Sequence, residues 1–180
     1  MNLAHFKTNI KNAGFTMIEL LIVMGILSVL AVGVLAAIDP IEQLNKSRDT
    51  AVRNDAANIL GASERYYAVK EYFPWNTSAA QANNAYPGGG SPTVTAVVDE
   101  LISSSELKNS FSTRVAKYIS GTQALSIHKA LNQNTVYVCF KPSSKAFIEE
   151  ADTRCDGTIP SDFPSSACVA NNVDDRICLP

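Results

Sequence analysis

Few residues of this chain have the types and spacing that catalysis requires. Outside the first 14 of the 180 residues the only histidine is His128, which we expect on the exposed face of a strand. The cysteines form no Cys-x-x-Cys pair, so the sequence predicts neither a zinc site nor a redox enzyme. No glycine-rich phosphate motif occurs, and a net charge of -2 offers no basic surface to nucleic acid. We therefore expect no enzyme and no nucleic-acid partner.

The cysteines instead predict disulfides. All four lie in the last 42 residues, beyond a long apolar run, a pattern typical of an exported domain in an oxidising compartment. Four cysteines allow three pairings. We expect Cys139 with Cys155, because an apolar segment before Cys155 can return alongside the strand that carries Cys139. We expect Cys168 with Cys178, which bracket a polar loop; the nested pairing of Cys139 with Cys178 is the alternative.

One carboxylate, that of Glu19, lies within a long apolar run, where a charge is energetically unfavourable. Residues 15–38 hold 19 apolar residues out of 24, with Glu19 as the only charge. The run is long enough to cross a bilayer as a helix. A charge at the centre of such a span costs about 2.5 kcal/mol or more, so Glu19 is expected to have a function. Lys7 and Lys11 precede the run without any acid, which places the N-terminus in the cytoplasm.

The residues around Glu19 carry a family resemblance. The segment 11–23, KNAGFTMIELLIV, resembles the processing motif of type IV prepilins and type II secretion pseudopilins. The resemblance implies that prepilin peptidase cuts between Gly14 and Phe15 and that Phe15 is then N-methylated. Glu19 would be the fifth residue of the mature chain, and we expect it to pair with the amine of Phe15 in a neighbouring subunit. Residues 1–14 are then a leader peptide and 15–38 the membrane and assembly helix.

A second helical segment must position the head. Residues 39–72 have apolar positions at helical intervals and predict an amphipathic continuation of the membrane helix. Together, residues 15–72 would extend for about 87 Å at 1.5 Å per residue, too long for one small domain to bury. Gly33 and Pro40 are the expected points of helix breakage, because glycine is flexible and proline removes a backbone donor.

Residues 73–180 are expected to form one globular head of α+β class. A three- to four-stranded antiparallel sheet would pack on residues 39–72, as in the pilin-like roll that the resemblance implies. One strand, 135–140, has apolar residues on both faces and should be buried on both sides. Residues 145–151 fit either a strand or one helical turn. The other expected elements are a loop at 76–94, a short helix at 96–102 and strands at 114–119 and 125–131.

The tail from residue 149 carries an excess of acids. Major pseudopilins hold calcium in a comparable loop, so the resemblance leaves calcium as an alternative. The spacing of the acids matches no EF-hand loop, and such an excess is typical of a solvated surface. We therefore expect no metal and no other cofactor. The candidate ligands would be Asp152, Asp156, Asp162, Asp174 and Asp175.

The pattern predicts a structural subunit of an extracytoplasmic, type IV pilus-like filament. It would be stored as a single-pass protein of the inner membrane and would polymerise through residues 15–38. The expected partners are prepilin peptidase, the inner-membrane pilus assembly machinery and further copies of the chain. Major pilin, minor pilin, competence pilin and pseudopilin are all open roles. The alternative is a signal-anchored extracytoplasmic enzyme or ligand-binding domain that does not polymerise.

Overall fold

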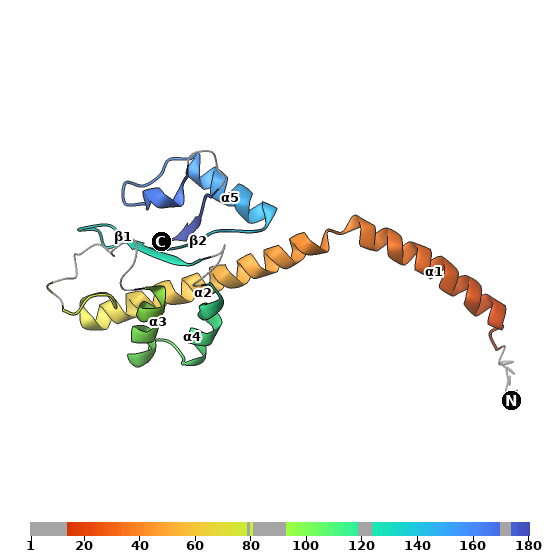
Figure 1. The fold of residues 1–180 in the computed structure, drawn as a ribbon, viewed down its shortest axis with the longest axis horizontal. Helices are drawn as coiled ribbons and strands as arrows, with labels where there is room; N and C mark the ends of the chain where they lie inside the picture. The colour runs from red at the N-terminus through yellow and green to blue at the C-terminus, as the bar shows by residue number, and fades with distance from the viewer. Residues whose placement is uncertain (1–13, 79, 81–92, 119–123, 170–173) are drawn as a thin grey trace, which may run out of the picture. The chain divides into compact units, whose positions relative to one another are not determined.

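The structure is a computed structural model that describes residues 14–78, 80, 93–118, 124–169 and 174–180. The chain divides at Pro40 into two units. The first contains helix α1, and the second is the head, which includes helix α2 and a small sheet (Figure 1). The predicted leader, apart from Gly14, and the predicted loop at 76–94 lie largely outside the described residues.

Helix α1 spans Met17–Ala37 and is apolar on every side. Its stretch Met17–Leu35 has a mean hydropathy of 2.7, is long enough to cross a membrane, and contains no buried residue. The backbone stays helical through Gly33 and leaves helical geometry at Ile38 and Asp39. Proline at position 40 disfavours helical angles at Asp39 and is well suited to the first position of a new helix.

Helix α2 spans Pro40–Lys70 and is the helix on which the head is built. Val52, Ala56 and Ile59 are fully buried and recur at three- and four-residue intervals, which places them on one face. The helix ends where Glu71 adopts a left-handed φ of 65° and donates its N–H to the carbonyl of Tyr67. The predicted end near Tyr72 is therefore two residues too late.

The sheet is antiparallel and has the order β1-β2-β3. Its strands are β1 (Ser126–Lys129), β2 (Val136–Phe140) and β3 (Ile177–Leu179). Every residue of β2 is buried, as predicted for 135–140. The inner face of β2 joins the core formed with α2, and its outer face, with Tyr137 and Cys139, packs in a second cluster with Ala167 and Cys178. The head is thus an α+β structure, as expected.

Further short helices complete the described part of the head. Helices α3 (Val94–Ser103) and α4 (Ser110–Val115) lie on the side of α2 opposite the sheet, and α5 (Lys145–Cys155) lies beyond the sheet (Figure 1). The predicted helix at 96–102 is confirmed as part of α3. The 3-10 turns η2 (Ala116–Tyr118) and η3 (Ser165–Ala167) also belong to the head.

One of the strand predictions is wrong. Residues 114–118 are helical, because the side chains that reach the core there, Phe111 and Val115, recur at a four-residue interval and not in alternation. For residues 145–151, whose sequence fits either a strand or one helical turn, the structure shows the helix α5. The third strand is instead β3, which is three residues long. It pairs with β2 across 39 residues of sequence, so local periodicity did not reveal it.

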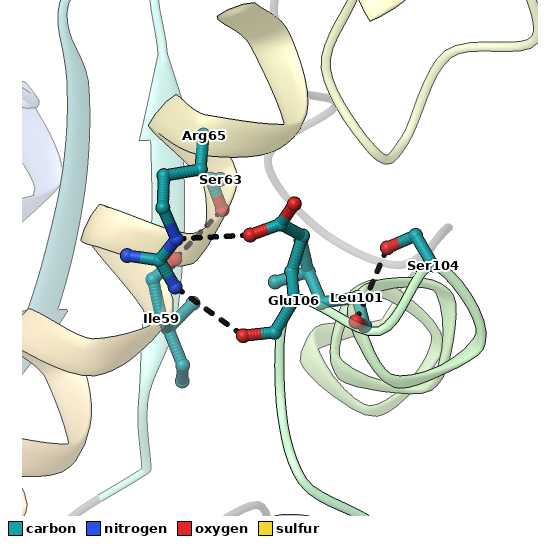
Figure 2. Close-up of polar contacts among 6 residues, drawn as sticks. All are labelled: Ile59, Ser63, Arg65, Leu101, Ser104 and Glu106. Atoms are coloured by element: carbon teal, nitrogen blue, oxygen red, sulfur yellow. Dashed lines mark hydrogen bonds and ion pairs between the residues drawn. The ribbon is translucent and has the colours of Figure 1, made fainter. Parts of the chain in front are cut away.

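Arg65 of α2 fixes the loop that follows α3. Its Nε lies 2.9 Å from a carboxylate oxygen of Glu106, and its Nη2 donates to the Glu106 carbonyl at 3.2 Å (Figure 2). Two residues earlier, the hydroxyl of Ser63 donates to the carbonyl of Ile59 within α2, and at the end of α3 the hydroxyl of Ser104 donates to the carbonyl of Leu101. The two Arg65 bonds tie the loop after α3 to α2, whereas the Ser63 and Ser104 bonds each stay within one helix or its cap.

Candidate processing and assembly site

The predicted cleavage junction lies just before α1. Gly14 and Phe15 are outside the helix, and Phe15 is 89% exposed. Thr16 is the N-cap, with an extended backbone at φ -79° and ψ 149°. The bond between Gly14 and Phe15 is therefore in non-helical, exposed backbone, which is the form that a peptidase active site can bind.

Gly14 has no structural need to be glycine within this chain. A Cβ added at Gly14 would meet no other atom within 4 Å, and the residue has no left-handed φ. A requirement for glycine at this position would have to come from a partner that binds the junction. The presence of glycine at position 14 is therefore better explained by the specificity of a processing enzyme than by a requirement of the fold.

Glu19 and Thr16 form a reciprocal capping box at the start of α1. Glu19 donates its backbone N–H to the Thr16 hydroxyl oxygen at 3.3 Å. The Thr16 backbone N–H and hydroxyl donate to Oε2 of Glu19 at 2.8 and 2.7 Å. Such caps stabilise a helix by about 1 kcal/mol, and a carboxylate in the first turn also interacts favourably with the helix dipole. The helix terminus thus holds the carboxylate within one turn of the junction.

Sequence reasoning missed the role of Thr16. The signal was present, because Thr-x-x-Glu directly before an apolar run is the pattern of a capping box. From the sequence alone, the only partner predicted for Glu19 is one from another subunit. In the isolated chain its first partners are the backbone and hydroxyl of Thr16.

The cysteines form two disulfides, but the expected pairing is wrong. Cys139 is bonded to Cys178, with the two Cα atoms 4.0 Å apart, and Cys155 is bonded to Cys168. The cause is β3, which places Cys178 directly opposite Cys139 in the sheet register. Because β3 occupies this edge of β2, the segment before Cys155 does not return as a strand and instead forms α5.

The acidic tail is partly engaged in the fold. Asp174 forms an ion pair with Lys141, whose hydrogen bond and charge hold the pKa of Asp174 below its usual range. Asp175 is buried and accepts the N–H of Val169 at 2.6 Å. Within the described part of the chain, no three His, Cys, Asp or Glu side chains gather into a group that could hold a metal ion.

His128 is half-buried, where the sequence predicted an exposed residue. Its Nε2 lies 3.1 Å from the hydroxyl of Ser126. Burial, together with the charge of Arg176, lowers the pKa of His128. No thiol is available to it, because all four cysteines are in disulfides.

Comparison with known proteins identifies the N-terminal segment. The family model described as the prokaryotic N-terminal methylation motif matches residues 9–35, which contain the junction, the capping box and most of α1. Neither the curated proteins nor the solved structures provide a match to the chain. The chain therefore carries the N-terminal signature of type IV pilins and pseudopilins, which marks it as a pilin-like substrate of prepilin peptidase.

Proposed function

We propose that this chain is the structural subunit of an extracytoplasmic type IV pilus-like filament, assembled through α1. The observation that carries the proposal is the location of Glu19. It is the only charge of α1 and lies within one turn of the Gly14–Phe15 junction, inside the matched motif. Cleavage there would create a new α-amine next to a carboxylate, and this pair can join two copies.

The head does not need α1 for its own stability. Its core of α2, α3, α4, α5 and the sheet consists of residues beyond Pro40, whereas the large apolar side chains described on α1 are all at least half exposed. An all-apolar helix without a core of its own must be covered by lipid or by other helices. Lipid would cover α1 while the protein is stored in the membrane, and the helices of other copies would cover it in the filament.

Glu19 supplies the specificity of this packing. A carboxylate inside a helical bundle without water needs a compensating charge. Unmethylated or singly methylated, the amine of Phe15 would be a cation at neutral pH, and a neighbouring copy would present it beside the capping box. Prepilin peptidase would create this amine, and the pilus assembly machinery of the inner membrane would bring the copies together.

The proposed topology agrees with the disulfides. A cytoplasmic N-terminus and a single span place the head outside the cytoplasm, where the Cys139–Cys178 and Cys155–Cys168 bonds persist. The motif belongs to a class of structural proteins, and we assign the head no enzymatic activity.

The test is mechanical shearing of cells, followed by fractionation and intact-mass measurement of the sheared protein. A filament subunit should appear in particles of very high mass, with a chain that begins at Phe15 and carries one methyl group. The alternative, a signal-anchored domain that does not polymerise, predicts that all of the protein stays with the membrane. That result would reject the filament.

A further inference from the structure

We propose that the head binds a small, uncharged aromatic molecule in a cavity on the outer side of its sheet. The cavity has a volume of about 150 Å³ and lies where the loop after α5 faces β2 and the C-terminal end of β3. Its wall is largely apolar. The residues that define it are Tyr137, Arg154, Thr158, Ile159, Phe163 and Pro180.

The volume sets the size of the occupant. An apolar protein cavity of about 150 Å³ accommodates one benzene-sized ring. Thr158 and Ile159 are exposed, whereas Tyr137 is 5% exposed, so the cavity opens to solvent on the side of the loop and closes at the sheet. A single ring can therefore enter from solvent and reach the buried wall.

The wall favours an aromatic ring over an aliphatic one. Tyr137 and Phe163 already form an edge-to-face pair, with ring centroids 5.4 Å apart, and a third ring can extend this arrangement. The guanidinium of Arg154 also belongs to the wall, and its Nη1 donates to the carbonyl of Cys178 at 2.6 Å. A planar cation held in this way attracts the face of an aromatic ring.

The charges around the cavity favour a neutral ligand. Arg154 is part of the cavity wall and lies 3.5 Å from Glu150, which is also paired with Arg53. A ligand cation would therefore be repelled by Arg154. Asp162 interacts with the Tyr137 hydroxyl, so a ligand carboxylate would meet a like charge near the inner wall. An uncharged aryl group avoids both repulsions.

The cavity is also preorganised. The loop that forms its mouth lies between Cys155 and Cys168, which are bonded to each other, and the wall at β3 is fixed by the Cys139–Cys178 bond. Binding therefore orders little additional chain, which reduces the entropic cost of association.

The experiment is a titration of the full chain in lipid nanodiscs with benzyl alcohol, followed by NMR of the Ile159 methyl groups. We expect a saturable shift with a dissociation constant of about 1 mM, which a ligand of this size can sustain. Cyclohexylmethanol, of matched shape without the aromatic ring, should bind at least about threefold more weakly. The Ile102 methyl groups, on α3, provide an internal reference.

Two variants separate the cavity from unspecific partitioning. Thr158→Trp fills the mouth and should abolish the saturable shift at Ile159. Val169→Trp places the same side chain at another exposed position, 42% accessible and outside the cavity wall, and should leave the shift intact. Equal affinity for cyclohexylmethanol would overturn the aromatic assignment. A linear shift without saturation, or one that persists in Thr158→Trp, would overturn the site itself.

Discussion

The carboxylate of Asp49 on α2 is fully buried and accepts the backbone N–H of Ser144 at 2.7 Å. Ser144 is the N-cap of α5, and its own side chain makes no capping hydrogen bond. Asp49 also accepts the N–H of Ser143, and Glu42, two turns earlier on α2, accepts that of Lys145 at 2.7 Å. Two acids of one helix thus cap the N-terminus of another, 94 to 103 residues further along the chain.

The variant Asp49→Asn should destabilise the head by about 2 kcal/mol. It removes a charged acceptor from three backbone contacts and buries an amide group that cannot replace both oxygens. Urea unfolding of the full chain, followed by the signal of Trp75, measures the change. Asp156→Asn, an exposed acid at the other end of α5, is the matched control and should alter stability by less than about 0.5 kcal/mol. Equal effects of the two variants would contradict the capping role.

The variant Gly14→Ala should accumulate as uncut precursor. The added methyl group meets no atom of this chain, so helix α1 and the head should be unchanged. Immunoblotting of whole cells distinguishes the two chain lengths. Gly25→Ala adds the same group at an equally open position within α1 and should be processed normally. Normal cutting of Gly14→Ala would show that recognition does not involve this glycine.

The variant Glu19→Gln should be cut normally and yield few or no filaments. The amide keeps the shape of the side chain and can still accept from Thr16, but it no longer attracts the amine of a neighbour. The amount of this protein that shearing releases from the cell surface measures the yield of filaments. The control is Glu64→Gln, an exposed carboxylate of α2, which should assemble as the wild type does. Wild-type filament yield from Glu19→Gln would reject the charge pairing.

The two disulfides should differ in their contribution to stability. Cys139 and Cys178 are 39 residues apart and Cys155 and Cys168 only 13, so loop entropy predicts about 4 kcal/mol for the first bond and about 3 kcal/mol for the second. Paired Cys→Ala variants, compared by urea unfolding, test this order. Peptide mapping without reduction should recover a linked peptide of Cys139 and Cys178. A peptide linking Cys139 to Cys155 would contradict the structure.

The variant Ser105→Gly should stabilise the head by up to about 1 kcal/mol. Ser105 has a left-handed φ of 65° directly after α3, and its N–H donates to Ile102 while that of Glu106 donates to Leu101. This is a Schellman motif, in which glycine adopts the required φ without the steric penalty of a side chain. Ser103→Gly, at the last residue of α3, should instead cost about 0.5 kcal/mol. Thermal unfolding of both variants provides the comparison.

The sequence alone determined the N-terminal part of this protein. The apolar run from Phe15, its single carboxylate Glu19 and the predicted junction at Gly14 are local features of the sequence, so they can be recognised without knowledge of distant contacts. The burial of β2 on both faces and the helical face of α2 also followed from local periodicity, because each element is long enough to show its pattern.

Tertiary structure decided the rest of the head. Residues 110–118 are helical because Phe111 and Val115 pack into the common core, which a short segment cannot indicate by itself. The pairing of Cys139 with Cys178 depends on β3, a three-residue strand whose hydrogen-bonding partner lies 39 residues earlier. The cap of α5 comes from Asp49, on another helix. Long-range backbone pairing and remote capping leave no periodic signal in the sequence, because the groups that satisfy them come from distant parts of the chain.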